Sequence, residues 1–364
     1  MKITVIGGGI FGCTIAAELN KTHDVVLLEK KSDLMLEASL GNQNRIHYGY
    51  HYPRSLGTAR QSLDGLLSYM MYYPGSVVAN FQNYYAIANK GSFTTREDFE
   101  KFCDDAGIYY KEDYPDAKFL NREKLASCYS VREPIFDYSI LKKEVIENLK
   151  SSGVKPLLDT FIVKQEKLKD GYVVVLNTGE SYHTDKVINA TYAGINTVNK
   201  QFDVTPRELR FEHAILPIFK CKDIPKIGIT IMDGAYCSVI PHAGHKDQWL
   251  LSHVDGTVFS NSNDINNLRV PKDKEEEYVA CERIYELSEE WCPFLKDVER
   301  NGCFSVAKTV EENKYDARKS VIATTTDSPN FCTVLGGKIS TCVKIAYELR
   351  DIFDNRENAG GVLV

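Results

Sequence analysis

The first thirty residues, MKITVIGGGIFGCTIAAELNKTHDVVLLEK (1–30), decide the fold. An apolar run over Lys2–Ile6 precedes three glycines spaced as G-x-G-x-x-G, a short helical stretch, a second apolar run and Glu29. This order is typical of a dinucleotide-binding βαβ unit. In such a unit Gly7 permits a tight turn, Gly9 lets the backbone approach a pyrophosphate, and Gly12 lets the helix pack on the sheet. Glu29 stands where the second strand should end, and its carboxylate suits both hydroxyls of an adenosine ribose.

Composition is that of an ordinary globular protein and excludes several classes. The 364 residues suffice for two or three domains, and no apolar run approaches the roughly 18 residues that a membrane helix needs. A net charge of −6, without a dense basic block, argues against nucleic acid as a partner. The ten cysteines include no C-x-x-C pair, which argues against zinc ribbons, thioredoxin-type chemistry and iron–sulfur clusters. We expect a cytoplasmic protein without a metal site, whose apolar N-terminus belongs to the glycine fingerprint and not to a signal peptide.

Periodicity predicts the main elements along the rest of the chain. Helices are expected at residues 55–72, 95–106, 138–151 and 273–290. The second of these is expected to be capped by Thr94, with Glu97 completing a capping box. A last helix should follow Gly336 and run through Leu349, and the final dozen residues should be frayed. Strands are expected at residues 81–87, 160–168, 172–177, 186–190, 207–219, 234–240, 249–253 and 333–335.

Four segments together resemble the FAD-dependent D-amino-acid oxidase superfamily. They are the opening βαβ unit, the loop of residues 39–52, the strand Lys186-Val-Ile-Asn-Ala-Thr191 and the stretch Gly336-Gly337-Lys338-Ile339-Ser340-Thr341. The nearest branches resemble glycerol-3-phosphate dehydrogenase and L-2-hydroxyglutarate dehydrogenase. The resemblance implies an α/β fold in which a Rossmann-like FAD-binding domain is interleaved with an α+β substrate domain built on a mixed or antiparallel sheet. The implied ranges are 1–75, 140–200 and 305–364 for the FAD-binding domain, and 76–139 and 201–304 for the substrate domain.

The same resemblance implies which residues contact FAD. Residues 39–44 would wrap the pyrophosphate and ribityl chain, and Ile46-His47-x-Gly49 would lie beneath the isoalloxazine ring. Lys338, at a helix start, would stabilise the negative charge of the reduced flavin. The strand around Val163 would present its backbone to adenine. The implied contacts are Gly7, Gly9, Ile10, Phe11, Gly12, Glu29, Lys30, Ser39, Asn42, Gln43, Asn44, His47, Val163, Ala190, Gly336, Gly337, Lys338 and Ile339.

Oxidation of an alcohol carbon by hydride transfer also requires a base for the O–H proton, and a neutral histidine suits that task near pH 7. His51 and His253 are the candidates for substrate chemistry, while His47 and Lys338 are expected at the flavin. Substrates in the related branches are usually anionic, which implies basic residues beside them. The candidate substrate contacts are Tyr52, Arg45, Arg54, Lys308 and Arg318.

Three functions remain open from the sequence. The first is FAD-dependent oxidation of a CH–OH group, by hydride transfer to flavin N5, in a small anionic hydroxy acid, polyol phosphate or sugar derivative. The second is oxidation of a CH–NH group in an amine or amino acid, and the third is a flavin-binding subunit without chemistry of its own. The electron acceptor (oxygen, quinone or carrier), a covalent flavin link and the oligomeric state also stay open. A cluster of tyrosines between residues 48 and 85 fits either a polar substrate pocket or packing between domains.

Overall fold

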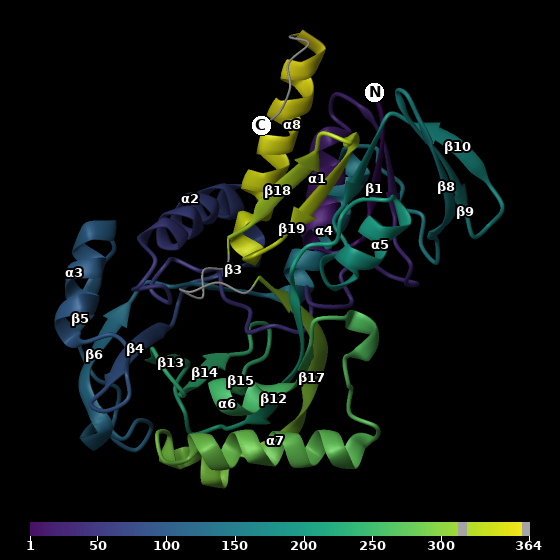
Figure 1. Ribbon diagram of the computed structural model, residues 1–364. Coiled ribbons are helices and arrows are strands. Elements are labelled where there is room, and N and C mark those ends of the chain that lie inside the picture. The colour runs from purple at the N-terminus through teal and green to yellow at the C-terminus, as the bar shows by residue number, and fades with distance from the viewer. Residues whose placement is uncertain (312–318, 359–364) are drawn as a thin grey trace.

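The computed structural model describes residues 1–311 and 319–358, and its upper part in Figure 1 is a five-stranded sheet in the order β18-β19-β11-β1-β2. Strands β2, β1, β11 and β19 run parallel, and β18 is antiparallel at the edge. The sheet therefore collects strands from three separated stretches of chain, as a discontinuous domain requires. The bounds are β1 Lys2–Ile6, β2 Asp24–Leu28, β11 Lys186–Asn189, β18 Val321–Thr325 and β19 Ser328–Leu335.

Both faces of this sheet are covered, because successive side chains of a strand point to opposite faces. Ile3 and Val5 of β1 pack in a core shared with four helices, whereas Ile6 packs with a small three-stranded sheet and a short helix. The helices of the first core are α1 Ile10–Leu19, α2 Leu56–Tyr72, α4 Tyr138–Ser151 and α8 Cys342–Asn358. The second layer consists of β8 Ile162–Leu168, β9 Gly171–Leu176, β10 Ser181–Thr184 and α5 Ile195–Gln201.

The lower part of Figure 1 is a mixed sheet in the order β16-β12-β15-β14-β13-β4-β6-β5, with β17 also paired to β12. The β13–β4 pair is parallel, and the other pairs are antiparallel. The bounds are β4 Gln82–Ala88, β5 Tyr110–Glu112, β6 Leu125–Val131, β12 Arg210–Lys220, β13 Ile227–Met232, β14 Cys237–Pro241, β15 Gln248–His253, β16 Val258–Ser262 and β17 Glu299–Val310.

Three longer helices and a few short elements complete the molecule. Helix α7 (Lys274–Ser288) packs Ile284 and Tyr285 on one end of the mixed sheet, and α3 (Arg96–Ala106) packs Phe99 on the other. Helix α2 (Leu56–Tyr72) lies against α8 of the upper part. The short elements are β3 Val77–Val78, β7 Ile135–Phe136, α6 Val254–Thr257 and the single turns Pro74–Ser76, Arg122–Lys124, Tyr192–Gly194, Ile265–Asn267, Pro293–Asp297 and Ile339–Thr341. Within the described ranges no helix combines the length and apolarity that crossing a bilayer requires.

Several expectations need correction. Helix α3 is capped one residue later than expected, because Thr95 and Asp98, and not Thr94 and Glu97, form the reciprocal bonds of the capping box. The expected domain boundary at residue 305 falls inside β17, which pairs with β12 along its length and so belongs to the mixed sheet. Helix α8 extends to Asn358, beyond the point where fraying was expected. The strands that were not predicted are β3, β5, β6, β7, β10, β13, β16, β17 and β18.

The tyrosine cluster is mostly packing. Tyr50, Tyr69, Tyr73 and Tyr85 are completely buried in the cores, and of the cluster only Tyr52 lines the cavity described below. All ten cysteines are free thiols.

Candidate functional site

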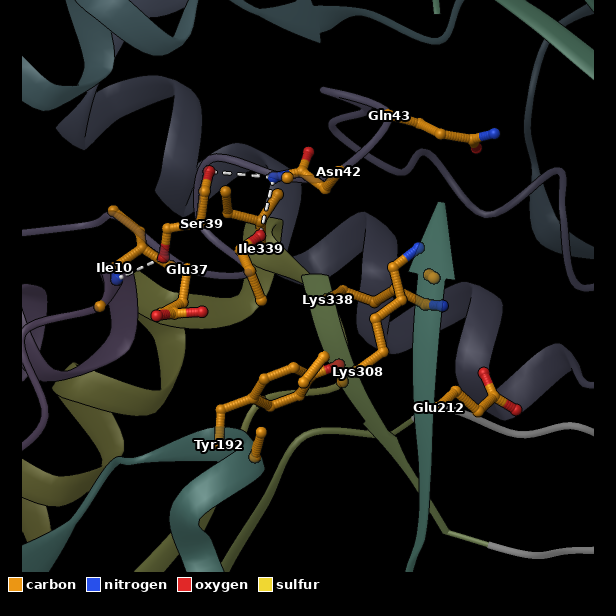
Figure 2. Close-up of a pocket in the computed structure, with 18 of the residues that line it drawn as sticks. Ile10, Glu37, Ser39, Asn42, Gln43, Tyr192, Glu212, Lys308, Lys338 and Ile339 are labelled. Carbon is orange, nitrogen blue, oxygen red and sulfur yellow. Dashed lines mark hydrogen bonds between the residues drawn. The ribbon is translucent and has the colours of Figure 1, made fainter. Parts of the chain in front are cut away.

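A cavity of about 1680 Å³ lies between the two large sheets and is lined by residues of both. From the parallel sheet it receives the turn after β1 and the turn after β19, and from the mixed sheet it receives side chains of β12, β15 and β17. Figure 2 shows Ile10, Ser39 and Asn42 on one side of this space and Lys308 and Lys338 on another. Its volume exceeds the several hundred cubic ångströms typical of a single small-ligand site.

The turn after β1 and the first turn of α1 each contain a position that admits only glycine. Gly7 has a φ of +107°, and a Cβ there would meet the carbonyl oxygen of Ala190 at 2.8 Å. A Cβ on Gly12 would lie 1.8 Å from the carbonyl oxygen of Gly7. Gly9 is the N-cap of α1 and offers no side-chain cap, and Gly9, Ile10 and Phe11 at the helix start line the cavity. Such a helix start favours a phosphate group.

Glu29 lies at the end of β2 and joins two loops at the cavity wall. Its Oε2 accepts a hydrogen bond from the backbone N–H of Gly8 (2.6 Å), and its Oε1 accepts one from that of Lys31 (2.8 Å). The side chain is largely buried and lines the cavity. A carboxylate held in this way suits the hydroxyl groups of a ribose, as the sequence predicts.

We expect Glu29→Gln to weaken FAD binding by about 10- to 100-fold, because the carboxylate loses its charge and one of its acceptor positions. Titration of the FAD-free protein followed by flavin fluorescence measures the change. Glu144→Gln is the matched control, since Glu144 also accepts two backbone N–H groups, those of Gly75 and Ser76, but lies outside the cavity lining. Equal loss of affinity in both variants would contradict a direct contact of Glu29 with the cofactor.

Hydrogen bonds of its own short polar side chains fix the conformation of the loop of residues 38–44. Ser39 Oγ accepts the N–H of Ile10 at 3.0 Å, which links the loop to the start of α1. Asn42 donates to the carbonyl groups of Ala38 and Ser39 (both 3.0 Å), as Figure 2 shows in part. Gln43 donates to the Ser252 hydroxyl, which connects this loop to the mixed sheet. Ser39, Asn42 and Gln43 all line the cavity.

Three of the predicted cofactor contacts do not line the cavity. Gly12 acts through packing, as described above. Asn44 is buried in a left-handed conformation (φ +56°), and its carbonyl accepts the N–H of Phe136. Val163 is 52% exposed on β8 and points elsewhere, whereas the preceding residues 160–162 line the cavity. The stretch around Val163 therefore reaches the cavity through these three residues and not through Val163 itself.

The other predicted cofactor contacts line the cavity, namely Ile10, Phe11, Lys30, His47, Ala190, Gly336, Gly337, Lys338 and Ile339. Gly336 is required by close packing, since a Cβ there would lie 2.5 Å from the Phe11 ring. The N–H of Gly337 donates to Ser320 Oγ at 2.9 Å and fixes the turn.

Lys338 projects a cation into this turn. Its ammonium nitrogen lies 4.0 Å from the centre of the Tyr52 ring, and the residue as a whole is 7% exposed. Desolvation by burial lowers the pKa of Lys338 to about 7. The lysine therefore titrates near neutral pH, and a negative group placed in the cavity would favour its charged form.

Two imidazoles of the segment after the loop face the same space. Burial lowers the pKa of His47 to about 4, although Glu133 opposes the shift. Desolvation between the cavity walls, together with Arg45, His47 and Lys338, lowers the pKa of His51 well below its usual value. The ring centres of the two histidines are 6.1 Å apart. Both imidazoles are therefore neutral at pH 7, the form that accepts a proton.

Glu133 is a buried residue that the sequence did not predict. It lies behind the cavity and accepts hydrogen bonds from Arg45 Nη1 (3.0 Å), the Tyr85 hydroxyl (2.7 Å) and the N–H of Tyr48 (3.1 Å). Burial raises the pKa of Glu133, but His47, Arg45 and Tyr85 together outweigh burial and hold that pKa well below its ordinary value. No sequence motif marks this glutamate, because its partners come from β4 and from a loop about 85 residues earlier.

The remaining candidates have more restricted roles. His253 lines the cavity, but its Nδ1 accepts the N–H of Asp255 (3.2 Å), so the ring caps α6. Arg45 is buried and also bonds Thr230 and Gln43. Arg54 forms a bidentate pair with Asp233 at 2.6 and 3.0 Å, and Lys308 of β17 stands opposite Glu212 of β12 (Figure 2). Arg318 lies outside the described residues.

In the part of the chain that the structure describes, no group of three or more metal-ligating side chains occurs.

Comparison with known proteins agrees with this geometry. The family model for DAO, described as FAD dependent oxidoreductase, matches residues 2–339. The chain is 25% identical over 372 residues to the FAD-dependent monooxygenase kojA of Aspergillus flavus, a match that covers 96% of this chain and 85% of the relative. It is 37% identical over 132 residues to the FAD-dependent monooxygenase FPY4 of Fusarium mangiferae, which is 36% of each chain.

Two solved structures share the fold. L-alpha-glycerophosphate oxidase of Mycoplasma pneumoniae with FAD bound superimposes with a TM-score of 0.78 at 17% identity, covering 97% of this chain and 94% of that one. Glycine oxidase of Geobacillus kaustophilus gives a TM-score of 0.74 at 14% identity, with the same two coverages.

Proposed function

Because this chain belongs to the DAO family of FAD-dependent oxidoreductases, we propose that it oxidises a CH–OH group of a small anionic hydroxy acid, polyol phosphate or sugar derivative to a carbonyl. The observation that carries the proposal is the pair of neutral imidazoles, His47 and His51, that face the cavity beside Lys338. An alcohol releases its proton only to a base in contact with it, and a neutral imidazole is such a base.

The residues around the cavity fit FAD. The glycine turn and the start of α1 suit its pyrophosphate, Glu29 its ribose, and the loop of residues 39–43 the chain between them. When bound, FAD supplies the two-electron acceptor for the hydride that leaves the carbon. The chain itself must orient the alcohol, exclude water and accept the hydroxyl proton at an imidazole nitrogen.

The basic side chains of the cavity support a substrate with a negative or strongly polar group. Lys308 and Lys338 reach into the cavity from β17 and from the turn after β19 (Figure 2). Arg45 and Arg54 also line the cavity, where they pair with Glu133 and Asp233.

Anaerobic mixing of the FAD-loaded protein with single donors tests the proposal. We expect one or more alcohols among lactate, 2-hydroxyglutarate, glycerol 3-phosphate and glucose to bleach the flavin absorbance near 450 nm, roughly the usual band of oxidised flavin. Bleaching by glycine or D-alanine, with none by the alcohols, would instead assign a CH–NH donor. Bleaching by no donor and no uptake of FAD would leave a protein without flavin chemistry. Admission of air then separates an oxidase from a dehydrogenase by the rate at which the yellow colour returns.

Substitution of the histidines provides a second expected result. The double variant His47→Asn, His51→Asn should reduce flavin at least about 100-fold more slowly with the fastest alcohol, because neither imidazole beside Lys338 remains to take the proton. His253→Asn should stay within about threefold of the wild type, since asparagine preserves the cap of α6. Stopped-flow absorbance measures both rates, and the FAD content per chain is the control for binding. A large loss in His253→Asn with an unaffected double variant would reject these assignments.

A further inference from the structure

We propose that Glu133 is the positioning residue of this site and that it holds His47 with Nδ1 protonated and Nε2 open to the cavity as the proton acceptor. The inference rests on the proposed oxidation and names His47 as the imidazole that accepts the proton of the alcohol. It also reverses the expectation from the sequence, in which His51 and His253 were the candidates for substrate chemistry.

The first argument is the geometry behind His47. Nδ1 of His47 is buried and has no hydrogen-bond partner among residues 1–311 and 319–358. The nearest acid group is Glu133 Oε2, at 3.8 Å. Part of the ring is exposed at the cavity wall, whereas the Glu133 side chain is completely buried and does not line the cavity. A carboxylate thus stands behind the ring and the cavity stands in front of it.

The second argument is the charge of that carboxylate. Arg45, Tyr85 and the N–H of Tyr48 all donate to Glu133, so it remains an ionised acceptor at neutral pH. A buried acceptor beside one ring nitrogen favours the tautomer that carries the proton on that nitrogen. Closing the gap from 3.8 Å needs less than an ångström of movement, and catalytic hydrogen bonds often tighten when ligands bind. The Nε2 lone pair then faces the cavity.

The third argument separates positioning of the ring from support of the backbone. The N–H of Ile46 donates to the carbonyl of Pro134 (3.0 Å), and the N–H of Phe136 donates to that of Asn44 (2.8 Å). These backbone bonds hold the segment around His47 against the segment around Glu133 without any side chain. His51, by comparison, has no hydrogen bond or ion pair to a carboxylate in the described ranges. Among the described residues, His47 alone combines an imidazole at the cavity wall with a buried carboxylate on the opposite side of its ring.

Glu133→Gln is the variant that tests the tautomer directly. Arg45 and the Tyr85 hydroxyl both donate to Oε1, whereas only the N–H of Tyr48 donates to Oε2. The two donors keep the amide oxygen of the glutamine on their side, so its NH2 group faces His47 and requires a lone pair on Nδ1. We expect the wild-type FAD-loaded protein, labelled with 15N-histidine, to show the Nδ1–H form for His47 and the variant to show the Nε2–H form. His47→Asn assigns the resonance, because its signal disappears.

The rate of flavin reduction gives the functional readout. With the alcohol that bleaches wild-type protein fastest, Glu133→Gln should lower the limiting rate of reduction by about 100-fold or more. The donor concentration that gives half the limiting rate should change less than about threefold, because Glu133 does not line the cavity. Glu144→Gln, which also removes a carboxylate that accepts two backbone N–H groups, should leave both the tautomer and the rate unchanged.

A buried Arg45 without its acid partner can prevent folding. If Glu133→Gln is insoluble, the double variant Arg45→Met, Glu133→Met removes both charges, and the His47 tautomer is then measured in it; the preference for Nδ1–H should be lost. An Nε2–H form of His47 in the wild type, or an unchanged tautomer and rate in the variants, would overturn the proposal. The tautomer needs no substrate, so it distinguishes failure of this proposal from failure of the proposed oxidation.

Discussion

Replacement of Gly12 by valine yields a protein that binds no FAD. A Cβ at this position would lie 1.8 Å from the carbonyl oxygen of Gly7, a contact that no side-chain adjustment relieves because the carbonyl belongs to the backbone. Helix α1 must then move away from β1, and the amide groups at its start leave the cavity wall. The loss of packing destabilises the parallel sheet as well, since α1 contributes buried side chains such as Ile15 and Leu19 to its core.

The measurement is the flavin absorbance of the purified variant together with its melting temperature and its titration with FAD. Gly57→Ala is the matched control, because Gly57 lies in the first turn of α2 with its nearest neighbour, Lys319 Nζ, 3.8 Å from the added Cβ. Alanine there should stabilise the helix by about 0.5–1 kcal/mol and leave FAD binding unchanged. A yellow Gly12→Val protein with wild-type affinity would show that the close approach of α1 to β1 is not needed for the cofactor.

Replacement of Lys338 by methionine slows anaerobic flavin reduction by about 100- to 1000-fold. The ammonium lies buried in the cavity wall, and a fixed cation stabilises negative charge that develops on the reduced cofactor. Methionine preserves most of the volume and the packing against Tyr52, so FAD should still bind. Lys344→Met is the control, since Lys344 of α8 pairs with Asp64 outside the cavity lining.

The same substitution changes how stability depends on pH in the FAD-free protein. Burial lowers the pKa of Lys338 from 10.5 to about 7, so between these values the unfolded chain binds a proton that the folded chain does not. The free energy of unfolding therefore rises with pH in this window, by up to about 1.4 kcal/mol per unit. Lys338→Met should lack this rise and should be more stable than the wild type below pH 7. Urea unfolding at pH 6, 7, 8 and 9 measures both effects, and parallel curves for the two proteins would contradict a buried ammonium.

The residues that the glycine turn, the end of β2 and the turn after β19 bring to the cavity wall could be predicted, because their signals are local. The turn at Gly7, the capless start of α1 at Gly9 and the acid at the end of β2 are each encoded within thirty residues. Gly336 and Lys338 likewise stand together at the end of one strand. Backbone geometry fixes the positions of these residues, so residue type and spacing suffice to predict where they lie.

The substrate half could not be predicted in the same way. Glu133 acquires its role from Arg45, Tyr85 and Tyr48, which other segments bring to it, and nothing next to it in sequence marks it. Arg54 was expected to meet the substrate, yet Asp233, from a distant loop, already pairs with it. Strand β17 escaped prediction because half-buried positions alternate irregularly along it and only its pairing with β12 makes it a strand. The surroundings of Glu133 and Arg54 depend on charged partners from distant segments, and β17 depends on its pairing with a distant strand.

The order of strands in the parallel sheet has a consequence for synthesis of the protein. The turns after β1, β11 and β19 meet at one edge of the sheet, although β1 leaves the ribosome first and β19 follows more than 300 residues later. Until β19 and Gly336 emerge, β11 lacks a neighbour on that side and the wall of the cavity is missing. Pairing of such distant segments is slow and leaves apolar strands exposed during elongation. FAD can therefore act as a folding ligand of the nascent chain only after β19 and Gly336 have emerged from the ribosome.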